Sequence, residues 1–81
     1  MLPEEREKEL RESVETARRE YVEATKLYDA WLVQAHSYNH GTPEMLAALD
    51  RATSLAPRLS ASLRDYHTAV SELANFYRSQ Q

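Results

Sequence analysis

With 81 residues, the chain is long enough for one small domain and no more. It contains no cysteine, which excludes a disulfide framework, a thiolate nucleophile and a cysteine-based metal site. Its 13 acidic and 10 basic residues give a formal net charge of −3 and are interleaved, whereas a nucleic-acid-binding surface needs concentrated positive charge.

The first predicted element is a helix over residues 3–39. Pro3, followed by Glu4 and Glu5, suits the first turn of a helix, where the helix dipole favours acidic side chains. Apolar residues then recur at steps of four and three, which is the spacing of one face of a helix. This first stripe consists of Leu10, Val14, Ala17, Tyr21, Ala24, Tyr28, Trp31, Ala35 and Tyr38.

A turn at residues 40–42 follows the first helix. Gly41 is the only glycine in the chain and is placed to adopt the left-handed conformation that ends a helix. Thr42 is predicted to cap the next helix, with Pro43 at its first position and Glu44 near its positive end.

The second predicted helix covers residues 43–79. Its stripe consists of Met45, Leu49, Ala52, Ala56, Leu59, Leu63, Tyr66, Val70, Leu73 and Tyr77. Pro57 interrupts this stretch, because proline lacks a backbone donor and clashes with the preceding turn. The stripe keeps its phase across Pro57, which favours a kinked continuous helix over a separate third helix capped by Ser54.

The two helices together predict an all-α fold: a long antiparallel two-helix hairpin that forms a single domain over residues 1–81. Because the apolar steps average 3.5 residues, we expect a gentle left-handed supercoil. Folding the stripes about Gly41 pairs positions whose numbers add to 83 or 84. Trp31 then lies opposite Ala52 and Ala17 opposite Tyr66, so that large residues meet small ones.

Few of the stripe residues are large and wholly apolar, since five of the 19 are alanine and five are tyrosine. A lone hairpin should therefore be marginally stable, and we expect a partner. The candidate interface lies beside the main stripes, with Leu27, Leu55, Ala48, Ala69 and Phe76 on one flank and Leu32 and Leu46 on the other. The favoured arrangement is a homodimer that forms a four-helix bundle, and the alternative is a helix of another protein docked on the flank.

We predict no catalytic residue, cofactor or metal site, and hence a non-enzymatic interaction protein. The alternative is a small-ligand, metal or phosphotransfer bundle that uses His36 and His40, four residues apart, or a groove lined by tyrosines. The segment 35–41 loosely resembles the phosphotransfer helix of histidine-containing phosphotransfer domains. It lacks their lysine, and its glycine is one position too far from the histidine, so no family is recognised.

The charged opening residues do not resemble a secretory signal, and no apolar stretch approaches the length of a membrane span. We therefore expect a cytoplasmic protein that does not insert into membranes.

Overall fold

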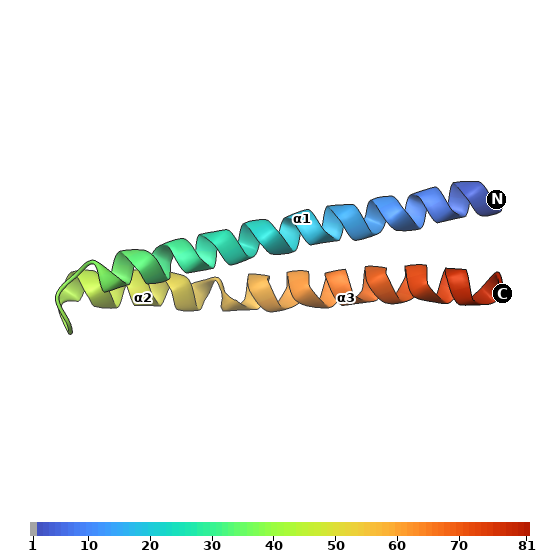
Figure 1. Ribbon diagram of the computed structural model, residues 1–81. Coiled ribbons are helices and arrows are strands. Elements are labelled where there is room, and N and C mark those ends of the chain that lie inside the picture. The colour runs from blue at the N-terminus through green and yellow to red at the C-terminus, as the bar shows by residue number, and fades with distance from the viewer. Residues whose placement is uncertain (1) are drawn as a thin grey trace.

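The computed structural model describes residues 2–81 and is a helical hairpin (Figure 1). Helix α1 spans Pro3–His36 and forms the first arm. Helices α2, Pro43–Ser54, and α3, Ala56–Ser79, follow one another along the second arm, so that both termini lie at the same end. The molecule measures 58 × 16 × 13 Å. The all-α hairpin is thus confirmed.

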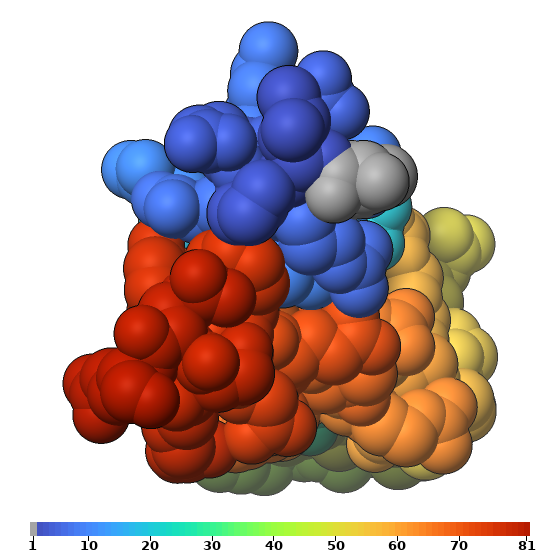
Figure 2. Space-filling view, turned by 90° about the vertical axis from the view of Figure 1, so that its right-hand side faces the viewer, coloured from blue at the N-terminus to red at the C-terminus, as the bar shows by residue number. Residues whose placement is uncertain are grey.

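The arms change their relative orientation along this length. Figure 1 shows α1 above α3 at the end that carries the termini, whereas α1 and α2 overlap at the turn. Figure 2 looks along the rod from the terminal end: the start of α1 (blue) lies over the end of α3 (red), and α2 (yellow) emerges to one side. In both views the arms are inclined to each other and are not parallel.

The first helix ends three residues earlier than predicted, at His36 rather than Asn39, which lengthens the turn to residues 37–42. The backbone N–H groups of Ser37 and Tyr38 bond to carbonyls three residues back instead of four, and the Ser37 hydroxyl donates to the Gln34 carbonyl at 2.6 Å. A serine side chain that competes for backbone carbonyls favours such a tightened final turn.

The remainder of the turn follows the prediction. Gly41 has a φ of +75°, the left-handed region that favours glycine. Thr42 caps α2 by accepting a hydrogen bond from the Met45 N–H at 3.3 Å, and its hydroxyl donates to the Asn39 carbonyl at 2.8 Å. Pro43 occupies the first helical position, where a missing N–H costs nothing.

The second arm is interrupted at a single residue, Leu55, between α2 and α3. Pro57 lies in the first turn of α3, and the Leu55 N–H bonds to the Ala52 carbonyl at 3.0 Å, three residues back. The Ser54 hydroxyl donates to the Arg51 carbonyl at 2.7 Å, which a regular helix would pair with Leu55. The Ser54 side chain therefore satisfies a carbonyl group at the break instead of capping α3. The second arm continues in the same direction after the break (Figure 1).

The core between the arms is built mainly from small side chains. The buried residues are Leu10, Ala17, Ala24, Ala35, Ala48, Ala52, Ser62 and Ala69. Only Leu10 among them is large, and the tyrosines and the tryptophan lie at the rim or outside. Small residues let two helices approach closely, but they remove little apolar area from water.

Three contacts between the arms define their register. The Tyr77 hydroxyl donates to Glu7 Oε1 at 3.2 Å, and these two numbers add to 84 as predicted. The Arg51 guanidinium lies 4.8 Å from the Trp31 ring centroid, so the residue next to Ala52 meets Trp31. The rings of Tyr21 and Tyr66 lie 6.0 Å apart, which places Tyr66 about one turn from the predicted contact at Ala17.

Candidate interaction surface

The second arm presents a different face to α1 from the one that the apolar stripe predicted. Ser62 and Ala69 are buried against α1, whereas their neighbours Leu63 and Val70 are 39% and 45% exposed. Apolar or small residues occupy both neighbouring positions in each repeat, so the sequence pattern fits two phases. The close approach of the arms selects the phase that puts the smaller residue of each of these pairs inside.

This phase moves most of the predicted interface residues into the hairpin. Ala48 and Ala69 are only 3% and 7% exposed, so their expected place on an outer flank is wrong. Leu55 and Phe76 are half-buried, and the Phe76 ring packs edge-on against Tyr77 with centroids 5.7 Å apart. Phe76 therefore does not stand outward as expected.

The other three predicted interface residues lie nearer the surface. Leu46 and Leu27 are 54% and 40% exposed, and Leu32 is half-buried. Leu27 follows Glu20 by seven residues and so shares its side of α1. That side is charged, because Glu20, Glu23, Arg58 and Asp65 line an open furrow there.

A different set of residues forms an apolar surface along the second arm. We name it the outer strip, and it consists of Leu49, Ala56, Leu63, Val70 and Tyr77. These residues recur every seven positions, which keeps them on one side of a helix. All except the half-buried Leu49 are exposed, and none is charged. The residues of the outer strip all belong to the apolar stripe predicted for the second helix. The sequence therefore identified these residues but assigned them to the contact between the arms.

The outer strip has a local hollow at its centre. Leu63, Tyr66, His67 and Val70 line an apolar depression of about 170 Å³ on the surface of α3. At one end of the strip Tyr77 bonds to Glu7 of α1, and at the other end the exposed Leu46 extends the apolar surface toward the turn. The strip thus runs along nearly the whole second arm.

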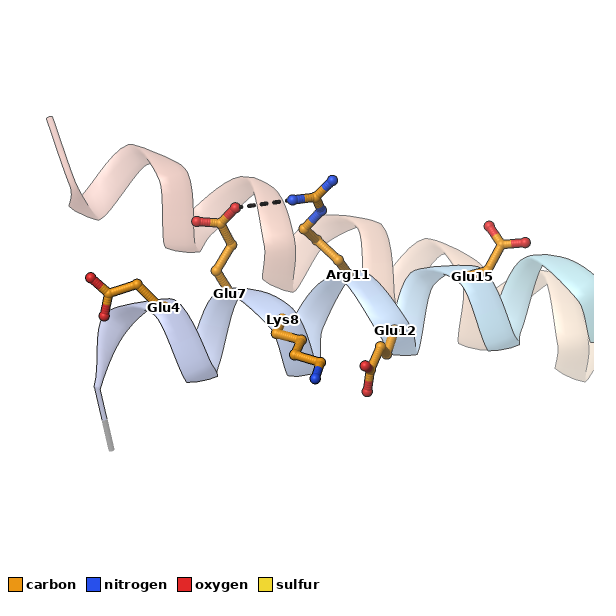
Figure 3. Close-up of a pocket in the computed structure, with 6 residues that line it drawn as sticks. All are labelled: Glu4, Glu7, Lys8, Arg11, Glu12 and Glu15. Atoms are coloured by element: carbon orange, nitrogen blue, oxygen red, sulfur yellow. Dashed lines mark hydrogen bonds and ion pairs between the residues drawn. The ribbon is translucent and has the colours of Figure 1, made fainter.

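The first turns of α1 carry a dense set of charges. A shallow depression of about 450 Å³ is lined by Glu4, Glu7, Lys8, Arg11, Glu12 and Glu15 (Figure 3). Figure 3 shows Glu7 and Arg11 paired at 3.3 Å while Lys8 and Glu12 point away on the other side of the helix. Because these groups do not converge on one point, they describe a solvated helix face.

Glu15 pairs with Arg18, three residues on, at 2.9 Å. The hydrogen bond from Arg18, together with its charge, lowers the pKa of the Glu15 carboxyl. Both side chains are exposed, so the pair adds little stability. The small stabilisation by this ion pair is present at neutral pH and is lost as the pH falls through the lowered pKa of Glu15.

The histidines considered as metal ligands lie in different local structures. His36 is the last residue of α1, and its Nδ1 lies 2.7 Å from the Leu32 carbonyl oxygen. His40 lies beyond the helix in the turn, where the sequence placed it, so the two side chains do not share the single helical face that the alternative metal site requires. Within residues 2–81, no group of three or more histidine, aspartate and glutamate side chains is placed to hold a metal ion.

No protein family, curated protein or solved structure matches the chain at a significant level. Among residues 2–81, no helix combines the length and the hydropathy that crossing a membrane requires.

Proposed function

We propose that this chain is a non-enzymatic protein–protein interaction module that associates through the outer strip. The candidate interface predicted from the sequence is thereby replaced by Leu49, Ala56, Leu63, Val70 and Tyr77, with Leu46 at its end. Burial of apolar surface against another helix supplies the binding free energy. The cytoplasmic location expected from the sequence remains part of this proposal.

The observation that carries the proposal is a mismatch between the inside and the outside of the hairpin. Inside, the fully buried residues of the second arm are the small Ala48, Ala52, Ser62 and Ala69, while the larger Leu55, Leu59, Leu73 and Phe76 are half-buried. Outside, it exposes Leu63, Val70 and Tyr77 in a line. A helix with apolar residues at three of every seven positions is typical of one that contacts two neighbours in a bundle. Within residues 2–81 only one neighbour for this arm, α1, is present.

The test compares two double variants that add the same charge to α3. In Leu63→Lys/Val70→Lys the lysines lie on the outer strip. In the control, Thr68→Lys/Asn75→Lys, they lie seven residues apart at exposed positions on the other side of α3, near Asp65 and Glu72. Light scattering over a range of concentrations measures the mass of each protein, and circular dichroism measures its helix content.

We expect the strip variant to lose association or helix content, because a charged ammonium is costly to bury in an apolar contact. The control should behave as the wild-type protein does. Equal behaviour of the two variants would contradict the proposal. The variant Leu27→Glu/Leu55→Glu, which the sequence alone suggests, is a poorer probe because Leu55 is half-buried within the hairpin.

A further inference from the structure

We infer that the partner of the outer strip is a second copy of this chain, packed antiparallel so that Leu63 of one copy meets Leu63 of the other. This inference rests on the proposed function and specifies its partner and geometry. The two hairpins then form a four-helix bundle whose two-fold axis passes at Leu63, the central residue of the outer strip.

The dimensions of the hairpin fit a pair of copies. The strip extends over 28 residues from Leu49 to Tyr77, which corresponds to about 42 Å of helix. Over this length a face 16 Å wide has an area of roughly 670 Å², within the range of about 600–1,000 Å² that each partner buries in a standard interface. Two copies laid face to face therefore cover enough surface for a specific dimer.

Side-chain volume favours the antiparallel arrangement over the parallel one. About Leu63, reversal of the strip places Ala56 against Val70 and Leu49 against Tyr77, so each layer receives residues of moderate combined size. A parallel arrangement places each residue against itself. Ala56 would then leave a void and Tyr77 would crowd its copy, and both defects are unfavourable in a packed interface.

The absence of cysteine from the chain makes a cross-linking test possible without background from native thiols. Single variants Leu63→Cys, Ala56→Cys and Val70→Cys are purified reduced, allowed to associate, and oxidised under mild conditions. Thr68→Cys, on the other side of α3, reports cross-links that arise from random collisions. The fraction of covalent dimer is measured by mass spectrometry and on non-reducing gels.

A disulfide requires Cα atoms within about 7 Å. In the antiparallel dimer two copies of residue 70 lie about 21 Å apart along the axis, because each is seven residues from the centre. We therefore expect Leu63→Cys to convert mostly to covalent dimer, and Ala56→Cys and Val70→Cys alone to remain at the Thr68→Cys background. A mixture of Ala56→Cys and Val70→Cys should form the cross-linked pair.

Two results would overturn the inference. Efficient self-cross-linking of all three strip variants indicates a parallel dimer, and no cross-linking above the Thr68→Cys background excludes a dimer centred on Leu63. These results are separate from the lysine test, in which light scattering of the purified protein reports self-association. If the strip lysines abolish that association while no cysteine variant cross-links, the chain associates through the outer strip in another arrangement, so the interaction module stands and the antiparallel geometry fails.

Discussion

At the scale of single residues, the turn of the hairpin depends on backbone conformation rather than on packing. Gly41 has a positive φ, and a Cβ built there would meet nothing within 4 Å. Any effect of a side chain at this position therefore comes from the strained backbone and not from a clash. Thr42 next to it makes the only side-chain cap among the helices of residues 2–81.

Replacement of Gly41 by alanine should lower the free energy of unfolding by about 1 kcal/mol, because alanine is strained in the left-handed conformation. Gly41→Asn should cost less, since asparagine tolerates this conformation better. Urea denaturation of the three proteins at one concentration measures the differences. An alanine variant as stable as the wild type would show that the turn adopts another conformation.

Replacement of Thr42 by alanine should cost about 1 kcal/mol, the usual contribution of a helix N-cap. The variant loses the acceptor for the Met45 N–H and the hydroxyl that donates to Asn39. Thr42→Ser keeps both groups and serves as the matched control. The prediction fails if serine and alanine at this position give the same urea midpoint.

At the scale of elements, α2 and α3 run in the same direction along the second arm, but the ladder of backbone hydrogen bonds is interrupted between them. The interruption at Leu55 is a consequence of Pro57, and Ser54 and Leu55 satisfy part of the backbone that it disrupts. Ala52 before the break and Ser62 after it are both buried against α1. The break therefore costs hydrogen bonds without displacing the packed face.

The variant Pro57→Ala should consequently stabilise the protein. We expect a gain of about 1 kcal/mol, below the about 3 kcal/mol of a proline in a regular helix interior, because the local hydrogen bonds are already partly repaired. Thermal unfolding followed by circular dichroism measures the change. Pro43→Ala, at the first position of α2, should have little effect. A loss of stability in Pro57→Ala would mean that the packing needs the break.

At the scale of the whole molecule, the hairpin is a thin rod whose arms meet through alanine. Ala24 is buried between the arms, whereas Ala30, on the same helix, is exposed. A close contact of this kind fixes the distance between the arms but leaves the larger side chains at the rim or outside. Association through the outer strip would bury them without changing the hairpin.

The variant Ala24→Leu should separate the arms and lower the free energy of unfolding by about 1–3 kcal/mol, the usual cost of overpacking a core. Ala30→Leu adds the same atoms at an exposed position and should be close to neutral. Denaturation of both proteins at equal concentration tests the contrast. If Ala24→Leu is as stable as Ala30→Leu, the arms are not held together at the distance described.

The sequence by itself determined the helical hairpin, its turn at Gly41 and its cap at Thr42. These features depend on local chemistry: apolar periodicity, a glycine that alone accepts positive φ, and a threonine hydroxyl beside a free N–H. The approximate register also followed, because it is set by the position of the turn, and the contact of Tyr77 with Glu7 agrees with it.

Only the tertiary structure decided which of two neighbouring apolar faces of the second arm points inward. Ser62 or Leu63, and Ala69 or Val70, fit the same periodicity, and the choice depends on how closely α1 approaches. The distance between the arms depends on the side chains of both arms together, so it cannot be predicted from the apolar stripe of either helix alone. At these two pairs of positions the smaller residue is inside, and the larger residues Leu63 and Val70 belong to the outer strip on which the proposed function depends.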